Sequence, residues 1–311
     1  MTSCVEKKRN MEKIYAVVVT FNRLELLKKN IACLRQNRPI ERIIVINNGS
    51  TDGTREWLAE QTDLLAITQE NVGGSGGFYR GMKEAVALGA DWVWCMDDDV
   101  FPRPDCLTQL LAHATNPEVG ILVPQRLIEG EVFATEFRAF NMTNPFTSTN
   151  VGKLKKNLPQ EATYIAGATF EGPFIRRTLI DKIGLPNKEL FIFYDDTDYC
   201  LRSLLAGYKN CYVPAAKMDK HRFFADDSWG DKQLKKKWKR LYQIRNATYL
   251  NHHYGKNWGV RTFRGFQVMA GYVVMALFTA PFSKAWQWRD IPRLYRAYRD
   301  GVRERLGKID W

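Results

Sequence analysis

Four short apolar runs, each followed by a polar turn and a stretch with helical periodicity, dominate the first hundred residues of the chain. They are Ile14–Val19, Arg42–Ile46, Leu64–Thr68 and Trp92–Met96. Runs rich in β-branched side chains and without polar alternation are typical of strands buried on both faces of a sheet. Because such strands alternate here with helical stretches, the pattern predicts an α/β fold with a doubly wound sheet.

The polar turns after these runs predict where a ligand would bind. They are Thr20–Arg23, Asn47–Asp52, Asn71–Gly77 and Asp97–Asp99. In sheets of this class, ligands bind beyond the carboxyl ends of the strands. All four turns fall at those ends, so we expect them to line one pocket.

The third and fourth turns carry the most specific chemistry. Four glycines in five residues (73, 74, 76 and 77) precede a helix predicted over 78–88, and this arrangement offers backbone N–H groups to a phosphate. Asp97, Asp98 and Asp99 end a buried strand, where adjacent carboxylates repel one another unless a cation gathers them. Either feature alone is more often an ordinary turn. Together they indicate a site for a nucleotide diphosphate and a divalent metal ion.

The second half of the chain is less regular. A strand is predicted over 120–124, order returns over 164–175, and a last strand is predicted over 211–214. The stretch 125–160, rich in Asn, Thr, Pro and Lys, is interpreted as a long excursion or lid rather than as a second domain.

A second acidic cluster follows the apolar run 190–194. Asp195, Asp196 and Asp198 open a helix predicted to run through Ala206. Such a cluster could simply be the acidic N-terminus of a helix. Adjacent carboxylates also raise one another's pKa, which suits a general base that works near neutral pH.

The net charge of +12 is distributed unevenly along the chain. Residues 1–231 are close to neutral and are predicted to form the catalytic domain, whereas 232–311 carry the basic excess and are predicted to be helical. A positive charge suits nucleic acid, anionic lipid or nucleotide substrates. A nucleic-acid-binding module would place basic and aromatic residues on the ordered domain, but the predicted rim is acidic, so we expect no nucleic-acid partner.

Cysteine usage and the N-terminus indicate a cytoplasmic protein. The six cysteines, at positions 4, 33, 95, 106, 200 and 211, form no C-x-x-C pair and are predicted to be reduced, buried thiols. The first residues contain no apolar segment of the kind found in secretory signals.

One uncharged segment, 265–283, lies within the basic region. It is marginally shorter than the roughly 20 apolar residues of a spanning helix, and Trp258, Trp286 and Trp288 flank it. We therefore predict an element that lies at a membrane surface, on the inner face of the cell membrane. The alternatives are a helix packed on the catalytic domain or on another subunit and, least favoured, a spanning helix.

With these motifs in place, the chain resembles a GT-A-fold glycosyltransferase of the inverting family 2, from about Ile14 to Phe223. The likeness is greatest to its galactofuranosyltransferase and rhamnosyltransferase branch. Four landmarks of that branch occur in order: N-x-G-G-S/A-G-G-F at 71–78, D-D-D at 97–99, D-D-x-D at 195–198, and a downstream histidine, His221. The resemblance implies a GT-A mixed sheet with a helical, basic C-terminal extension.

The resemblance also implies a role for each candidate site residue. The residues implied to bind the nucleotide sugar are Thr20, Phe21, Arg23, Asn48, Asp52, Asn71, Gly73, Gly74, Asp97 and Asp98. Asp97, Asp99 and His221 are implied to hold a divalent cation, Mn²⁺ or Mg²⁺, and Asp196 is implied to be the catalytic base. The residues alone leave plainer alternatives open: Asn48 and Asp52 as turn residues, and His221 as a surface histidine.

The expected activity is the metal-dependent transfer of galactofuranose from UDP-galactofuranose to a hydroxyl of a lipid-linked cell-surface glycan, with inversion. A rhamnosyltransferase that uses dTDP-rhamnose is the alternative. A nucleotidyltransferase would carry a glycine-rich signature after the first strand, where this chain has Thr20-Phe-Asn-Arg23. The sequence leaves open whether the chain forms an oligomer.

Overall fold

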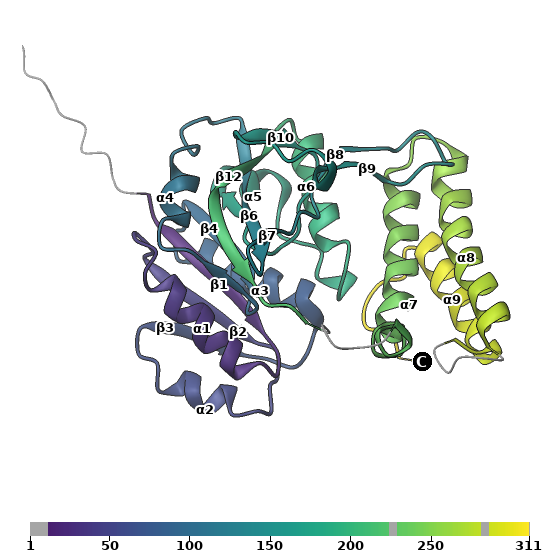
Figure 1. Ribbon diagram of the computed structural model, residues 1–311, viewed down its shortest axis with the longest axis horizontal. Helices are drawn as coiled ribbons and strands as arrows, with labels where there is room; N and C mark the ends of the chain where they lie inside the picture. Colours follow the sequence, from purple (N-terminus) through teal and green to yellow (C-terminus); the bar gives the residue numbers. More distant parts are fainter. Residues whose placement is uncertain (1–11, 224–228, 281–285, 311) are drawn as a thin grey trace, which may run out of the picture.

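The computed structural model describes residues 12–223, 229–280 and 286–310, which form an α/β domain followed by a group of helices (Figure 1). The strands are β1 (Ile14–Thr20), β2 (Arg42–Asn47), β3 (Leu64–Thr68), β4 (Trp92–Asp97), β5 (Val100–Pro102), β6 (Val119–Ile128), β7 (Glu131–Val132), β8 (Phe137–Phe140), β9 (Asn150–Lys153), β10 (Thr163–Ile165), β11 (Phe174–Arg176) and β12 (Lys209–Lys220). The α-helices are α1 (Leu24–Leu34), α2 (Thr54–Ala59), α3 (Gly73–Ala87), α4 (Cys106–Leu111), α5 (Arg177–Ile183), α6 (Asp195–Leu205), α7 (Trp229–Tyr254), α8 (Arg264–Thr279) and α9 (Ile291–Val302). Short helical turns are η1 (Leu154–Lys156), η2 (Lys188–Leu190), η3 (Gly259–Phe263) and η4 (Trp288–Asp290).

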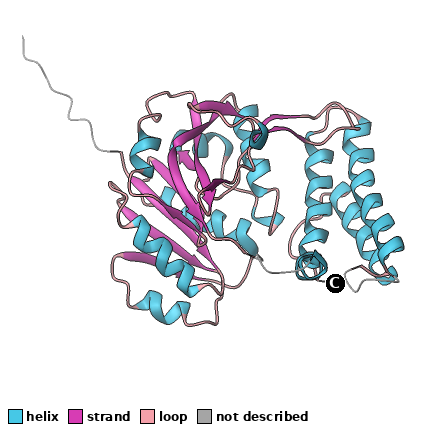
Figure 2. Cartoon of the chain, in the orientation of Figure 1, coloured by secondary structure: helices cyan, strands magenta, loops and turns pink. Residues whose placement is uncertain are grey.

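The main sheet is mixed and doubly wound. Its strand order is β10-β12-β6-β11-β4-β1-β2-β3, and the four predicted strands of the first hundred residues are parallel neighbours. Short β11 runs antiparallel between β4 and β6, which makes the sheet mixed. Helices α1, α2 and α4 pack on one face and α3, α5 and α6 on the other (Figure 2). The predicted fold is confirmed.

The glycines of the third turn correct one prediction. Helix α3 begins at Gly73 and not at residue 78, so these glycines are its first turns rather than a loop before it. A Cβ at Gly77 would lie 2.5 Å from Cγ1 of Val19, and one at Gly81 would collide with Val17. The glycines therefore let α3 lie directly on β1, an approach that a larger residue would block.

The excursion at 125–160 contains more order than its composition predicts. β6 continues to Ile128, β7 pairs back on it, and β8 and β9 form a separate two-stranded sheet. The tip of this hairpin contacts the C-terminal helices: Arg264 Nη1 donates to the carbonyl of Asn141 (2.7 Å), and Asn257 Nδ2 donates to the carbonyl of Thr143 (2.6 Å). The excursion thus links the two parts of the chain.

The C-terminal helices α7, α8 and α9 have a small core of their own, built from Ile244, Met269, Ala276, Trp286, Leu294 and Ala297. Trp286 is 1% exposed, so it belongs to this core and is not the membrane-flanking residue that the sequence predicted. Among the described helices none combines the length and the apolar character needed to cross a bilayer. The stretch 281–283 of the uncharged segment lies outside the described residues.

The cysteine prediction agrees with the structure where it can be examined. Cys95, Cys106, Cys200 and Cys211 are free and buried, and Cys33 is free and half-buried. Cys4 lies outside the described residues.

Candidate active site

At the end of β4, the fourth polar turn meets the first one. Asp98, 1% exposed, accepts hydrogen bonds from Thr20 Oγ1 (2.7 Å) and Arg23 Nη1 (3.0 Å). Burial raises the pKa of Asp98, and the positive charge of Arg23 opposes that rise. Residues predicted from two separate motifs therefore meet, because β1 and β4 are adjacent parallel strands.

Asp99 lies between two positively charged side chains. Lys220 Nζ is 2.9 Å from Asp99 Oδ2, and Arg23 Nη1 is 3.7 Å from the same oxygen. The other oxygen, Oδ1, is buried and has no hydrogen-bond partner in the described part of the chain. A buried carboxylate oxygen without a donor is costly unless another group satisfies it.

Glu171 belongs to this site, although the sequence analysis missed it. Its Oε1 is 3.0 Å from Lys220 Nζ, and its Oε2 accepts a hydrogen bond from Arg126, which also pairs with Glu136. The sequence did carry a signal, because Glu171 is the single charged residue between Thr163 and Ile175.

Asp97 is surrounded by acids. Burial raises its pKa well above the ordinary value, and the negative charges of Asp99 and Glu171 raise it further. A cation would relieve this repulsion and satisfy Asp99 Oδ1. Magnesium-type sites commonly use one or two carboxylates and complete the shell with phosphates of the substrate. The oxygens of Asp97 and Asp99 fit such a cation.

The placement of His221 is less specific. Its backbone N–H donates to the carbonyl of Asp99 (2.9 Å), but its exposed ring packs edge-on against Phe223, with centroids 4.6 Å apart. Across the described residues, no three His, Cys, Asp or Glu side chains are arranged to hold a metal ion. The role of His221 as a metal ligand stays a prediction.

The second acidic cluster opens α6 as predicted. Asp198 is held by Arg202 Nε (2.9 Å) and by the hydroxyl of Tyr254 (2.7 Å), so it joins α6 to α7. Burial raises the pKa of Asp195 to about 6. Burial, followed by the charge of Asp195, raises the pKa of Asp196 to about 7. These two adjacent carboxylates can therefore exchange a proton near neutral pH, and Asp196 has the higher pKa of the two.

The two acidic clusters belong to one electrostatic environment. The charge of Glu171 raises the pKa of both Asp97 and Asp196, so both carboxylates lie within its range. These three carboxylates come from β4, from the segment before β11 and from α6. The structure thus brings the predicted base and the predicted metal ligands to the same edge of the sheet.

Other predicted residues support the turns around the site. Asn48 donates to the Gly73 carbonyl (2.9 Å), and Asn71 Oδ1 accepts from the Gly73 N–H (3.0 Å). Asp52 accepts from the Leu24 N–H (2.9 Å) at the start of α1. These contacts explain the three side chains as turn residues, and their contact with a nucleotide stays a prediction.

The start of α3 is partly blocked to a phosphate. The Ser75 N–H donates to the carbonyl of Phe191 (3.2 Å), and a Cβ at Gly73 would collide with that carbonyl. By contrast, a Cβ at Gly74 would meet nothing within 4 Å, and Phe21 is 44% exposed. Gly74 and Phe21 therefore offer open surface to a ligand.

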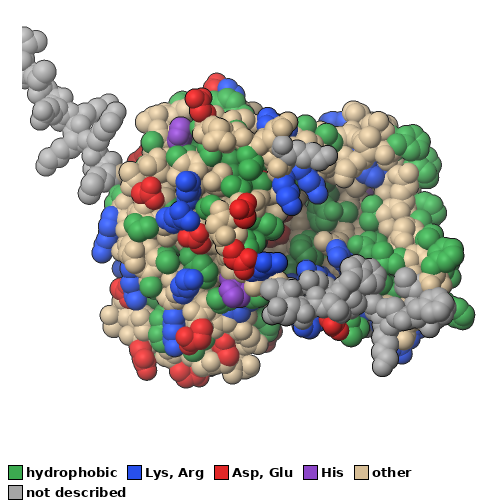
Figure 3. Space-filling view, viewed as in Figure 1, with side chains coloured by type: hydrophobic (Ala, Val, Ile, Leu, Met, Phe, Trp, Pro, Cys, Tyr) green, Lys and Arg blue, Asp and Glu red, His purple; other side chains and the backbone are tan. Residues whose placement is uncertain are grey.

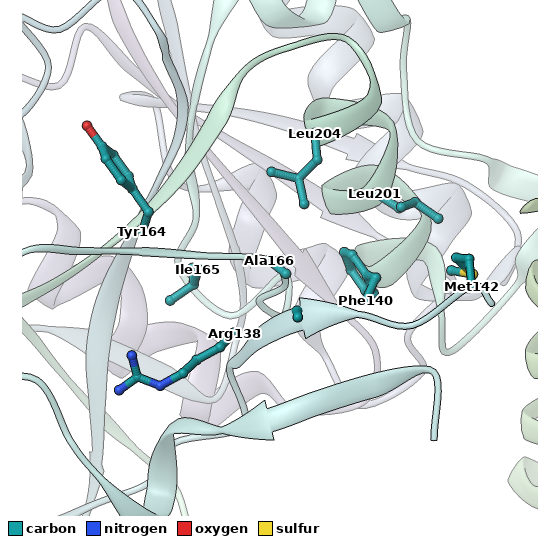
Figure 4. A pocket seen from close by; sticks show the side chains of 9 residues that line it. Arg138, Phe140, Met142, Tyr164, Ile165, Ala166, Leu201 and Leu204 are labelled. Atoms are coloured by element: carbon teal, nitrogen blue, oxygen red, sulfur yellow. The ribbon is translucent and has the colours of Figure 1, made fainter. Parts of the chain in front are cut away.

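A cavity of about 360 Å³ lies elsewhere, between β8, β10 and α6 (Figure 4). It is lined by Arg138, Ala139, Phe140, Met142, Tyr164, Ile165, Ala166, Leu201 and Leu204. None of the predicted site residues lines it. The surface is also hollowed between the α/β domain and the C-terminal helices, where basic and acidic side chains lie close together (Figure 3).

The chain is similar in sequence to two known sugar transferases. Galactofuranosyltransferase GlfT1 of Mycolicibacterium smegmatis is 33% identical over 212 residues, which cover 63% of this chain and 67% of that protein. The dTDP-rhamnosyl transferase RfbF of Shigella flexneri is 25% identical over 255 residues, which cover 75% of this chain and 78% of that protein.

Solved structures show the fold. The chain superposes with a TM-score of 0.56 on GalNAc-T7 in complex with UDP, GalNAc and Mn²⁺, at 14% identity, covering 86% of this chain and 58% of that one. It superposes with a TM-score of 0.55 on Staphylococcus aureus TarS, covering 94% and 82%. A family model described as glycosyl transferase family 2 matches residues 15–184, more than half of the chain. The chain therefore belongs to glycosyl transferase family 2 and is a glycosyltransferase with a GT-A fold.

Proposed function

We propose that the enzyme transfers galactofuranose from UDP-galactofuranose to a hydroxyl of a lipid-linked cell-surface glycan, with inversion at the anomeric carbon. The observation that carries the catalytic part is the placement of Asp196. Its pKa is about 7, and it shares one electrostatic environment with the acids at the end of β4. The similarity to GlfT1 supports the choice of donor.

Asp196 would act as the general base. Its Oδ1 accepts hydrogen bonds from the N–H (2.5 Å) and the Oγ1 (3.1 Å) of Thr197, which fix the carboxylate at the start of α6. In its ionised form, the carboxylate would take the proton of the acceptor hydroxyl as that oxygen attacks the anomeric carbon. Attack on the face opposite the diphosphate inverts the configuration in one step and needs no enzyme nucleophile.

Asp97 and Asp99 would hold a divalent cation, Mn²⁺ or Mg²⁺, and His221 would be an additional ligand. When bound, such a cation would neutralise negative charge on the leaving diphosphate as a Lewis acid. Around it, Thr20 and Arg23 keep Asp98 in place, and Lys220 forms ion pairs with both Asp99 and Glu171.

The alternative donor is dTDP-rhamnose. The similarity to RfbF supports it, because that similarity covers a larger share of this chain than the similarity to GlfT1 does. Both donors place the same diphosphate beside the same acids. They differ in the base and in the sugar, which residues with open surface, such as Phe21 and Gly74, would contact.

We also propose that the enzyme works at the inner face of the cell membrane. The outward side of α8 carries the exposed apolar residues Phe266, Val268, Val274, Leu277 and Phe278. Residues 265–280 carry no charge, whereas α7 and α9 are rich in Lys and Arg. An apolar face beside basic residues suits a surface of anionic lipid, where a lipid-linked acceptor would be found.

A donor panel tests the proposal. Full-length enzyme is incubated with UDP-galactofuranose, dTDP-rhamnose and other sugar nucleotides, with Mn²⁺ and a polyprenyl-diphosphate-linked acceptor, and the products are weighed by mass spectrometry. We expect a mass gain of one hexose from UDP-galactofuranose alone and no gain with Asp99→Ala. Transfer from dTDP-rhamnose alone would replace the donor assignment, and full activity in EDTA would contradict the metal.

A further inference from the structure

Helix α7 belongs to the edge of the catalytic site as well as to the C-terminal helices. The ring of Tyr242 stacks on that of Phe191, with centroids 5.0 Å apart and planes 16° apart. The carbonyl of Phe191 in turn accepts the Ser75 N–H at the start of α3. One turn further along α7, Asn246 Nδ2 donates to the carbonyls of Leu190, Ile192 and Phe193, each at 2.9 Å. This part of α7 therefore has a fixed position next to α3 and α6.

Lys239 lies on the same face of α7 as Tyr242, because residues three apart in a helix are neighbours on its surface. Its ammonium group is 5.4 Å from the ring centre of Trp238. It also interacts electrostatically with Arg23, Asp97 and Asp99, which lie more than 130 residues away in the sequence. The charge of this C-terminal residue thus lies within electrostatic range of the acids at the end of β4.

Arg23 contacts the same group of acids. Its guanidinium lies 4.5 Å above the ring of Phe223 and donates to Asp98 through one nitrogen. A guanidinium carries five N–H donors, so one bond to Asp98 leaves others for a ligand. Two cations from distant parts of the chain therefore approach the same carboxylates.

We propose that Lys239 and Arg23 together bind the diphosphate of the nucleotide-sugar donor, so that the C-terminal helices complete the donor site. This inference rests on the proposed function. Charge-assisted hydrogen bonds from ammonium and guanidinium groups to phosphate oxygens are among the stronger polar contacts in proteins.

The charges around the site explain why such cations are needed. Asp97, Asp98, Asp99 and Glu171 would repel a diphosphate, and a divalent cation held by two carboxylates adds no net positive charge. Lys220 is shared between Asp99 and Glu171. Burial lowers the pKa of Lys239, and the positive charge of Arg23 lowers it further, whereas the negative charges of Asp97 and Asp99 oppose this change.

Nucleotide binding to full-length Lys239→Gln tests the inference. Calorimetric titrations with UDP, UMP and uridine, in the presence of Mn²⁺, separate the contribution of the second phosphate. We expect UDP to bind about 10- to 100-fold more weakly, the usual cost of a lost bond between charged groups, with little change for uridine. Lys239→Arg should restore most of the affinity. Lys83→Gln is the matched control, since it removes the same charge from an exposed position on α3.

The outcomes distinguish this inference from the proposed function. If Lys239→Gln binds UDP as tightly as the parent enzyme, the inference is overturned while the proposed transfer stands. An equal loss for UDP and uridine would also overturn it, because that result indicates a general disturbance of the site. If the parent enzyme does not bind UDP, both proposals fail together.

Discussion

At the scale of single residues, one substitution can separate the size of the Asp196 side chain from its ability to accept a proton. Asp196→Asn keeps the size of the side chain but cannot accept the acceptor's proton, so kcat should fall by roughly 10²–10⁴-fold. UDP affinity should change little. In the parent enzyme, kcat should rise with pH through about 7, as Asp196 loses its proton. An unchanged kcat in the variant would remove Asp196 from the mechanism.

The same variant should change stability in a predictable direction. The folded-state pKa of Asp196 is about 7 and its ordinary value is 3.8, so between these values the folded protein holds a proton that the unfolded chain has lost. Asp196 therefore lowers the free energy of unfolding by an amount that grows as the pH rises from about 4 to 7. The Tm of Asp196→Asn minus the Tm of the parent should increase over this pH range and stay constant above it.

Glu171 offers a test of the shared electrostatic environment. Because its negative charge raises the pKa of Asp196, Glu171→Gln should move the midpoint of the pH–activity curve below that of the parent. Glu136→Gln is the matched control, since Glu136 also pairs with Arg126. Both variants should lose stability, but only the first should shift the midpoint. Equal midpoints would show that Glu171 does not act on the base.

At the scale of elements, the packing of α3 on β1 sets the position of the site. In Gly81→Ala, the added methyl group would collide with Val17, which should lower the free energy of unfolding by about 1–3 kcal/mol even though alanine favours helices. Gly74→Ala is the control, because its Cβ would meet open space. Denaturant unfolding of both variants measures the difference, and equal stabilities would contradict the packing argument.

The start of α3 is a feature that could not be predicted from the sequence. Strands β1 to β4 could be predicted because each is a local apolar run, and the acids that follow β4 and open α6 could be found because they interrupt such runs. Glycine normally disfavours a helix, so the extent of α3 depends on its contacts with β1, which no local pattern reveals. Glu171 and Lys239 were missed for a related reason: their partners lie far away in the sequence.

At the scale of the whole molecule, the C-terminal helices connect the site to the outer surface. One face of α7 contacts the segment before α6, and α8 packs on α7 with its apolar side outward. The hairpin β8–β9 reaches the same helices through Arg264 and Asn257. If Asp196 is the base that we propose, a surface that holds α8 would also fix the direction from which the acceptor approaches it.

This arrangement predicts which residues would contact lipid in the membrane association that we propose. Phe278 is 75% exposed on α8, so Phe278→Glu should weaken cosedimentation with anionic liposomes, while Leu205→Glu, at an exposed apolar position on α6, should not. Rising salt should weaken binding of the parent enzyme by screening its basic residues, but a part should persist because burial of apolar groups is not screened. If both variants sediment like the parent at every salt concentration, the face of α8 does not contact lipid and must serve protein packing.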